Sequence, residues 1–331
     1  MRVVTCTAFG PVEQLSIEER PAVPCGPHDV RIAVAAAGVN YVDGLFVQGL
    51  YQIKPPLPFV PGNEVAGSIV EVGADVRSFE VGDRVFANVG LGGYASEVVV
   101  DARRVHRTPT RLTDGQAATF TQSYMTAWFA LHARARATPG QWLLVLGAGG
   151  GVGLAAVDVG RAMGLHVIAA ASSEAKRAVA SDRGAIATLD TSTGDIKTAT
   201  RELLKQIGGD VPPDGVDLVY DPVGGALGEQ ALRTLRDDGQ FIVIGFAGGG
   251  IPLLPANQVL LRNRRVTGVD WGGWVGRHQA ENAAMLADVV AAIERGELSP
   301  VEPVAYPLAE VAVALRDQLE RRVVGKTILV P

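Results

Sequence analysis

A cluster of glycines marks the point where a predicted strand gives way to a predicted helix. Residues 143–153 read LLVLGAGGGVG, a small-residue variant of the G-x-G-x-x-G pattern. Glycines permit a tight turn and let backbone N–H groups approach a pyrophosphate, while the helix N-terminus adds a partial positive charge. Because a strand, a helix and a second strand occur at βαβ spacing, the pattern predicts dinucleotide binding rather than a turn that only connects two elements. The residues expected to contact the cofactor are Ala148, Gly150, Gly151, Val152 and Gly153.

The end of the second strand of this unit distinguishes between the two nicotinamide cofactors. An acidic residue about 20 residues after the glycines binds the adenosine ribose hydroxyls of NAD. This chain has AAASS at residues 169–173 and no acid before Glu174. Small hydroxyl side chains leave room for a 2′-phosphate, and Lys176 supplies its counter-charge unless it is a solvated surface lysine. The pattern predicts NADPH (NADP) as the cofactor, with Ser172, Ser173 and Lys176 at its phosphate.

The elements that must position this turn alternate regularly from residue 141 onward. Strands are expected at 142–146, 166–170, 216–220, 240–245 and 264–269. Helices are expected at 152–163, 173–183, 196–207 and 228–235. Alternation of this kind builds a doubly wound parallel sheet with helices on both faces, so the predicted fold class is α/β.

The rest of the chain has a different character. Short β-branched segments separated by Gly and Pro indicate a mostly β region in the first third, at 30–35, 65–72, 84–87 and 97–100. One helix is expected at 117–137, ended by Pro139 and Gly140. Beyond the alternating region, we expect helices at 277–295 and 308–320 and a strand at 326–330. That last strand has no sheet of its own, and a return to the first domain would give it one.

Length and composition restrict the class of protein. The 331 residues are 47% apolar and 20% charged, which excludes disordered, collagen-like and coiled-coil chains. At roughly 150 residues per domain, the length predicts two domains. The net charge of -5 argues against nucleic acid or an anionic membrane as a partner. Two cysteines cannot form a disulfide framework, and no signal or membrane-spanning segment is visible, so we expect a cytoplasmic protein.

Several short motifs occur in one order along nearly the whole chain. They are AGVNYVD at 37–43, GLY at 49–51, PLPFVPGNEVAG at 56–67, VGDRV at 81–85, GGYA at 92–95, GGVG at 150–153, YDPVGG at 220–225 and IGFA at 244–247. In this order they resemble the medium-chain dehydrogenase/reductase superfamily, specifically its zinc-free quinone oxidoreductase (ζ-crystallin-like) branch. Each motif alone is weak, whereas their combined order is specific.

The resemblance implies a fold of two domains. A GroES-like β-rich catalytic domain would comprise residues 1–123 and 267–331, and a Rossmann domain with a doubly wound parallel sheet would comprise residues 124–266. The active site of the family lies in the cleft between the domains. Family members usually form a homodimer through the last Rossmann strands, which here lie near residues 264–270.

The residues at the superfamily's zinc positions are not metal ligands in this chain. Asn40 occupies the position of the catalytic cysteine, and the usual Gly-His-Glu reads Gly62-Asn63-Glu64. Independently, the five histidines and two cysteines show no ligand spacing. We therefore expect no metal site. For Glu64 we expect a buried structural carboxylate paired with Arg84 or another base.

Without a metal, a bound nicotinamide does the redox work as a hydride donor. An α,β-unsaturated carbonyl accepts hydride conjugatively and needs only a hydrogen-bond donor and a proton. We therefore expect an NADPH:quinone oxidoreductase acting on a small-molecule quinone or enone. Two alternatives stay open: a reductase of 2-enoyl thioesters or other activated alkenes, and an NADPH-binding structural protein with little turnover.

Three residues are candidates for catalysis. Asn40 carries an uncharged amide that can orient a carbonyl or the nicotinamide ribose, and the alternative is an Asn that only ends a strand. Tyr51 can donate a hydrogen bond and a proton, and the alternative is a loop aromatic packed over the proline-rich segment. Thr126 matches a family threonine whose hydroxyl reaches nicotinamide; Asn40 and Thr126 therefore also count as cofactor-binding. Asp43 and Asp221 are expected to cap the helices that follow them.

Further cofactor contacts are expected from both halves of the chain. Gly245 and Phe246 follow a strand at the sheet edge where α/β proteins bind ligands. Trp271 could form a wall of the nicotinamide pocket together with Phe246, and aromatic packing is the alternative for both rings. Arg321 and Lys326 occupy a region that reaches the cofactor in relatives, and the alternative is that both are solvated.

Overall fold

The computed structural model describes residues 1–208 and 214–331, which form two units. Unit 1 comprises Met1–Gln122 and Pro300–Pro331, and unit 2 comprises Ser123–Ser299. The sequence predicted that residues 267–299 belong with the N-terminal part of the chain, whereas they lie in unit 2. Aromatic packing within unit 2 helps to hold them there, because the ring of Trp274 lies 4.7 Å from that of Phe129, measured between centroids.

Unit 2 is built on a six-stranded parallel sheet, as the alternating pattern predicts. In order across the sheet, its strands are β10 (Ala187–Asp190), β9 (His166–Ala171), β8 (Trp142–Leu146), β11 (Val216–Asp221), β12 (Leu235–Val243) and β13 (Arg265–Gly268). The first strand of the unit is central, and the chain winds outward from it in both directions. This is the doubly wound Rossmann order, and it confirms the predicted α/β fold class.

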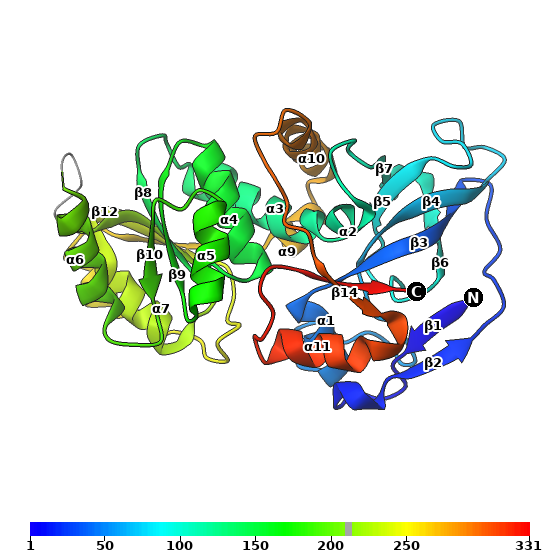
Figure 1. The fold of residues 1–331 in the computed structure, drawn as a ribbon, viewed down its shortest axis with the longest axis horizontal. Helices are drawn as coiled ribbons and strands as arrows, with labels where there is room; N and C mark the ends of the chain where they lie inside the picture. Colours follow the sequence, from blue (N-terminus) through cyan, green and yellow to red (C-terminus); the bar gives the residue numbers. More distant parts are fainter. Residues whose placement is uncertain (209–213) are drawn as a thin grey trace. The chain divides into compact units, whose positions relative to one another are not determined.

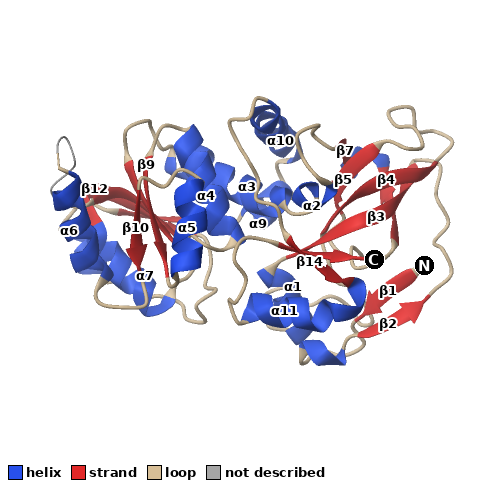
Figure 2. Ribbon diagram, viewed as in Figure 1, coloured by secondary structure: helices blue, strands red, loops and turns tan. Residues whose placement is uncertain are grey.

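Helices cover both faces of this sheet. The described helices that follow β8 in this unit are α4 (Gly151–Ala162), α5 (Glu174–Asp182), α6 (Ile196–Ile207), α7 (Gly225–Ala231), η4 (Leu232–Thr234), α8 (Ala256–Leu260), α9 (Trp271–Val275) and α10 (Gln279–Glu294). Successive strand residues point to opposite faces: Leu144 and Leu146 share a hydrophobic cluster with residues of α6 and α7, whereas Leu143 contacts the position of Gly160 in α4. Figure 2 shows the strands between α4 and α5 on one side and α6 on the other.

Two regions differ from the predicted elements. The single helix expected at 117–137 is divided into α2 (Asp114–Ala117), α3 (Phe120–Trp128) and the π-helical η3 (Phe129–Ala135). The hydroxyl of Thr119 donates to the carbonyl of Gly115 at 3.0 Å, where the first of these helices ends. β12 begins at Leu235 rather than at residue 240, because Asp237, Asp238 and Gly239 are residue types typical of turns and hide the strand in the sequence. Asp238 has a positive φ of 61°.

Unit 1 contains a seven-stranded sheet made from both ends of its chain. In order, the strands are β14 (Val304–Pro307), β15 (Thr327–Val330), β3 (Asp29–Val39), β4 (Glu64–Val72), β5 (Arg84–Asn88) and β7 (Val105–Arg107), and β6 (Glu97–Asp101) pairs with β3. A separate small sheet pairs β1 (Arg2–Thr5) with β2 (Ser16–Glu19). The C-terminal β15 lies between β14 and β3, so the predicted return to the first domain is confirmed. Figure 1 shows this red strand beside the blue β3.

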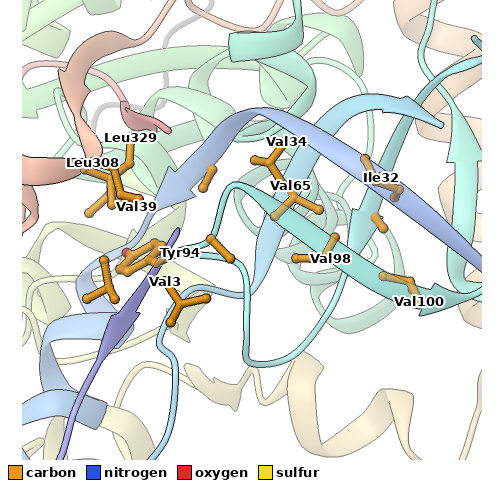
Figure 3. Packing of buried hydrophobic residues seen from close by; sticks show 14 of the residues in the cluster. Val3, Ile32, Val34, Val39, Val65, Tyr94, Val98, Val100, Leu308 and Leu329 are labelled. Carbon is orange, nitrogen blue, oxygen red and sulfur yellow. The ribbon is translucent and has the colours of Figure 1, made fainter. Parts of the chain in front are cut away.

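Small aliphatic side chains fill the core of unit 1. Alternate residues of β3, such as Val30, Ile32 and Val34, are buried, as expected of a strand with one face on the core. Figure 3 shows part of the cluster, from Leu329 in the last strand at one end to Val100 in β6 at the other. The helices of this unit are η1 (Val12–Gln14), α1 (Tyr41–Gln48), η2 (Ala102–Arg104), α2, η5 (Leu308–Glu310) and α11 (Val311–Leu319). In the described part of the chain, no helix combines the length and apolar character needed to cross a membrane.

Candidate active site

The glycine turn between β8 and α4 presents an unobstructed backbone. Gly147 has a φ of +58°, a conformation that favours glycine. A Cβ at Gly153 would lie 2.3 Å from the Gly147 carbonyl oxygen, so only glycine lets the helix start this close to the turn. Gly150 precedes α4 without a side-chain cap, which leaves the first N–H groups of the helix available to an anion. The turn therefore has the shape that a dinucleotide pyrophosphate requires.

Lys176 lies against this turn. A Cβ placed on Gly149 would be 2.3 Å from the Cβ of Lys176 and 2.5 Å from its Cγ, so the lysine stem passes directly over the turn. Ser173 caps the start of α5, and its Oγ accepts from the backbone N–H of Lys176 at 3.4 Å. Ser172, directly after β9, is exposed. The structure thus places the predicted phosphate-binding lysine at the predicted pyrophosphate turn.

A second cation at this sheet edge was not predicted from the sequence. Nη1 of Arg177 donates to the carbonyl oxygen of Ala171 at 3.1 Å and lies 3.0 Å from Oδ2 of Asp190. Its guanidinium is therefore fixed between the ends of β9 and β10. In the sequence, only its position directly after Lys176 indicated that Arg177 lies near the predicted phosphate site.

A buried polar cluster lies in unit 1, where β3 ends and β4 begins. Nδ2 of Asn40 donates to Oδ1 of Asn63 at 3.1 Å and to Oε2 of Glu64 at 2.8 Å. Oδ1 of Asn40 accepts from Nζ of Lys326 at 2.6 Å. An amide nitrogen carries two N–H groups, and both are used within the chain. Asn40 therefore has no N–H left for a substrate carbonyl, but its Oδ1 keeps one acceptor site that suits a ribose hydroxyl.

Glu64 and Lys326 form the charged centre of this cluster. Oε1 of Glu64 accepts from the backbone N–H of Gln122 at 2.7 Å. Burial raises the pKa of the Glu64 carboxyl, and the charge of Lys326 opposes that rise. Burial also lowers the pKa of the Lys326 ammonium, which the charges of Glu64 and Asp43 oppose. Each charge thus stabilises the ionised form of the other.

Two expectations about these charges are corrected by the structure. Glu64 is buried as predicted, but Arg84 is not its partner, because Arg84 instead binds Asp114 at 2.6 Å. Lys326 is not solvated, since only 6% of its surface is exposed. The cation whose charge stabilises the Glu64 carboxylate therefore comes from the opposite end of the chain, directly before β15, and is bonded to Asn40.

Asp43 fixes the start of α1 below Asn40. Its Oδ2 accepts from the backbone N–H of Asn40 at 2.8 Å and from the hydroxyl of Tyr94 at 2.9 Å. Its Oδ1 is buried without a hydrogen-bond partner among the described residues. Burial raises the pKa of Asp43 to about 7, although both hydrogen bonds oppose the rise. The predicted capping role of Asp43 is confirmed.

Known proteins match both halves of this chain. The family model "Alcohol dehydrogenase GroES-like domain" matches residues 26–110, and "Zinc-binding dehydrogenase" matches residues 151–289. The chain is 35% identical over 329 residues to quinone oxidoreductase-like protein 2 of Rattus norvegicus, a match that covers 99% of this chain and 91% of that protein. The chain belongs to the quinone oxidoreductase branch of the medium-chain dehydrogenase/reductase superfamily.

Solved structures agree with this assignment. A probable oxidoreductase of Mycobacterium abscessus is 33% identical, with a TM-score of 0.87 and coverage of 100% of this chain and 99% of that one. A mycobacterial protein solved in complex with NADPH is 28% identical, with a TM-score of 0.86 and full coverage of both chains. This medium-chain dehydrogenase/reductase therefore shares its fold with both proteins along its whole length.

The remaining predicted residues of this medium-chain dehydrogenase/reductase are distributed over both units. In unit 1, the ring of Tyr51 packs against Phe46 of α1, 4.7 Å between centroids. Arg321, also in unit 1, follows α11 with a φ of 58°. In unit 2, Thr126 is buried within α3. The structure thus places Tyr51 and Asn40 at opposite ends of α1.

Gly245 and Phe246 follow β12 at the carboxyl edge of the Rossmann sheet. Phe246 is 40% exposed, which leaves its ring available to a ligand. Trp271 is only 8% exposed, and its Nε1 donates to Oδ1 of Asn282 in α10 at 3.0 Å. The polar edge of Trp271 is therefore satisfied within unit 2, which favours a packing role.

Asp221 ends the neighbouring strand β11. Its Oδ1 accepts from the N–H groups of Val223 and Gly224, each at 2.8 Å. Both donors lie in the turn before α7, and the N-cap of that helix, Gly224, has no side-chain cap, so Asp221 holds the turn and the predicted helix cap is corrected. Burial raises the pKa of the Asp221 carboxyl.

Proposed function

We propose that this medium-chain dehydrogenase/reductase is an NADPH-dependent reductase of quinones. One observation carries the proposal: the stem of Lys176 lies over Gly149 in the glycine turn, and Ser172 and Ser173 stand where an NAD-dependent protein needs an acid. An ammonium at that place can form a charge-assisted hydrogen bond with the 2′-phosphate of NADPH. The unsubstituted ribose of NADH has no negative charge to pair with it. The NADPH complex of the mycobacterial neighbour supports the same cofactor.

The acceptor proposed is a quinone or a related enone. When bound, NADPH supplies a hydride, and one proton completes the reduction to the hydroquinone or the saturated ketone. The chain must hold the acceptor oxygen, deliver that proton and exclude water. The name of the rat relative supports a quinone as the physiological class.

We assign roles to four residues, three of unit 1 and one of unit 2, from hydrogen-bonding capacity. Asn40 is proposed to accept from a ribose hydroxyl, because its donors are already used. Tyr51 is proposed to hold the acceptor oxygen and to donate the proton, since its phenol can do both. Lys326 is a positioning residue that fixes the orientation of the Asn40 amide. Thr126 is proposed to contact the nicotinamide.

The reduction is proposed to need no zinc. The superfamily's zinc positions hold the amides of Asn40 and Asn63, which bond to each other, and Asn40 also donates to Glu64. The Lys326 ammonium already supplies a positive charge beside them. Among the described residues, no three His, Cys, Asp or Glu side chains gather as a metal site.

A homodimer is proposed through the edge of the Rossmann sheet. β13 pairs with β12 on one side and ends the described sheet on the other. Leu260 and Leu261, just before it, are 75% and 76% exposed. A second copy would cover this apolar edge. Sedimentation of the purified chain should give twice the monomer mass, and a monomer at micromolar concentration would contradict the proposal.

The test of the proposed reaction is the oxidation of NADPH by a benzoquinone and by a 2-enoyl thioester at matched concentrations. We expect faster turnover with the quinone, and Tyr51→Phe should lower kcat by about 100-fold with unchanged affinity for NADPH. Tyr306→Phe, which removes a hydroxyl that donates to Asp317, serves as the control. Preference for the thioester would identify an enoyl reductase instead, and tight NADPH binding without turnover would contradict any reductase function.

A further inference from the structure

A second polar site lies in unit 2, in a pocket of about 240 Å³. Its lining comes from α6, η4, α8 and the segment between α8 and β13. The lining residues are Lys197, Arg201, Arg233, Gln258, Arg262 and Arg264. Five of the six are cationic, and no carboxylate is among the described residues that line the pocket. Like charges gathered in this way repel one another unless an anion lies between them.

Arg264 is the buried member of this pocket. It is 5% exposed, and its Nη2 donates to the carbonyl oxygen of Leu235. Its Nη1 is buried without a hydrogen-bond partner among the described residues. A buried charged donor without a partner is costly, so the structure leaves a site that a ligand oxygen would satisfy.

The charge around Arg264 is only partly compensated. Arg262 pairs with Asp237 at 2.9 Å. Burial lowers the pKa of the Arg264 guanidinium, and the charges of Arg262 and Arg201 lower it further. An anion in the pocket would oppose all three effects.

The pocket is separate from the cofactor turn. Arg264 bonds to the carbonyl of Leu235, the first residue of β12, and directly precedes β13. These strands are parallel to β8, whose carboxyl end leads into the glycine turn. The first residues of parallel strands lie at the opposite edge of the sheet from their last residues. Arg264 therefore belongs to the edge away from the predicted dinucleotide site.

We propose that this pocket binds a small, multiply charged phosphate anion of about the size of pyrophosphate. Guanidinium groups match phosphate oxygens in a bidentate geometry, and five cations favour a ligand with at least two negative charges. The volume is below the roughly 300–1,000 Å³ of sites that enclose a drug-sized ligand, so a whole dinucleotide does not fit. The ligand is either a free anion or the phosphate end of a larger molecule that projects into solvent.

Calorimetric titration of the full-length chain with inorganic pyrophosphate tests the proposal, at fixed ionic strength near 0.15 M. We expect saturable binding that weakens by about tenfold or more in Arg201→Ala/Arg233→Ala. These two side chains are not fully buried, so their loss should spare the fold. Binding should persist in Lys176→Ala and in Gly153→Ala, which remove the cation and distort the backbone of the glycine turn. It should also persist in Arg103→Ala/Arg104→Ala, a matched loss of two exposed cations.

The other arms of the titration decide between ligand sources. Equal affinity for ADP in the Lys176→Ala background would indicate that the pocket takes the phosphate end of a larger molecule, and weaker binding of ADP would indicate a free anion. Absence of saturable binding would overturn the proposal. So would equal affinity in the Arg201→Ala/Arg233→Ala variant, or equal displacement by chloride and sulfate at matched ionic strength.

Discussion

At the scale of single residues, the Lys326 ammonium determines what the Asn40 amide can do. The two side chains are bonded at 2.6 Å and lie 286 residues apart in the chain. Because Glu64 and Asn63 take both N–H groups and Lys326 takes one acceptor site, the amide can be oriented in only one way. The motif around Asn40 could be recognised from the sequence, but its partner Lys326 could not, since only the pairing of β15 with β3 brings it there.

Removal of either charge of this cluster should be more harmful than removal of both. Lys326→Met leaves the Glu64 carboxylate buried without its counter-charge, and Glu64→Gln removes the larger of the two negative charges that act on Lys326. We expect each variant to lose about 3–5 kcal/mol of stability, because a lone buried charge is costly. The double variant should lose less than the sum of the two, by about 1–3 kcal/mol. Urea unfolding of the four proteins measures this, and strictly additive losses would contradict the coupling.

Asp43 should make stability depend on pH. Its pKa is raised to about 7 in the folded chain, whereas an unfolded Asp has a pKa of about 3.9. Between these pH values the folded chain binds a proton that the unfolded chain has lost. The contribution of Asp43 to the free energy of unfolding therefore falls as the pH rises to 7. From pH 5 to 8, the stability of Asp43→Asn relative to the unchanged chain should therefore improve by about 2–3 kcal/mol.

The same pair of unfolding measurements on Asp182→Asn controls for general effects of charge. Asp182 is exposed at the end of α5. Its substitution should give a stability difference that is nearly the same at both pH values. An equally constant difference for Asp43→Asn would show that Asp43 does not titrate in this range.

At the scale of elements, the spacing of apolar residues along the chain determined most of the strands and helices that could be predicted. The strand at 142–146 and the helix at 196–207 match β8 and α6, because their apolar spacing agrees with their burial. β12 was predicted too short, since the turn-type residues Asp237, Asp238 and Gly239 lie inside the strand. The small strands β1 and β2 were not predicted from the sequence, because most of β2 is exposed. The glycine turn was recognisable because the backbone itself, rather than a distant contact, requires those residues.

Gly153→Ala tests the geometry of the glycine turn. Alanine favours helix over glycine by about 1 kcal/mol, so an unobstructed position would gain stability. At Gly153 the new Cβ would instead lie 2.3 Å from the carbonyl oxygen of Gly147 and would push the turn apart. We expect affinity for NADPH to fall by about tenfold or more, with no gain in stability.

Gly272→Ala in α9 is the matched control. The nearest atom to a Cβ there is 4.0 Å away, so the change should leave NADPH affinity unaltered. Unchanged NADPH binding by Gly153→Ala, measured by titration of NADPH fluorescence, would show that the turn does not hold the cofactor.

At the scale of the whole molecule, the two units differ in how much of their structure could be predicted from the sequence. Unit 2 is continuous, so the βαβ pattern alone predicted its doubly wound parallel sheet. Unit 1 joins the first 122 residues to the last 32, Pro300–Pro331, and its buried charges meet only because both ends share one sheet. The predicted boundary at residue 267 was wrong because Trp271 and Trp274 form their contacts with residues of unit 2.

The role of Lys176 in cofactor choice is measured by the steady-state preference for NADPH over NADH in the unchanged chain and in Lys176→Ala, with a benzoquinone as acceptor. If Lys176 binds the 2′-phosphate, its loss should lower kcat/KM for NADPH by about 10- to 100-fold and leave the value for NADH within about twofold. Lys205→Ala, on the exposed face of α6, should change neither value. Equal losses with both cofactors, or a preference for NADH in the unchanged chain, would contradict the claim.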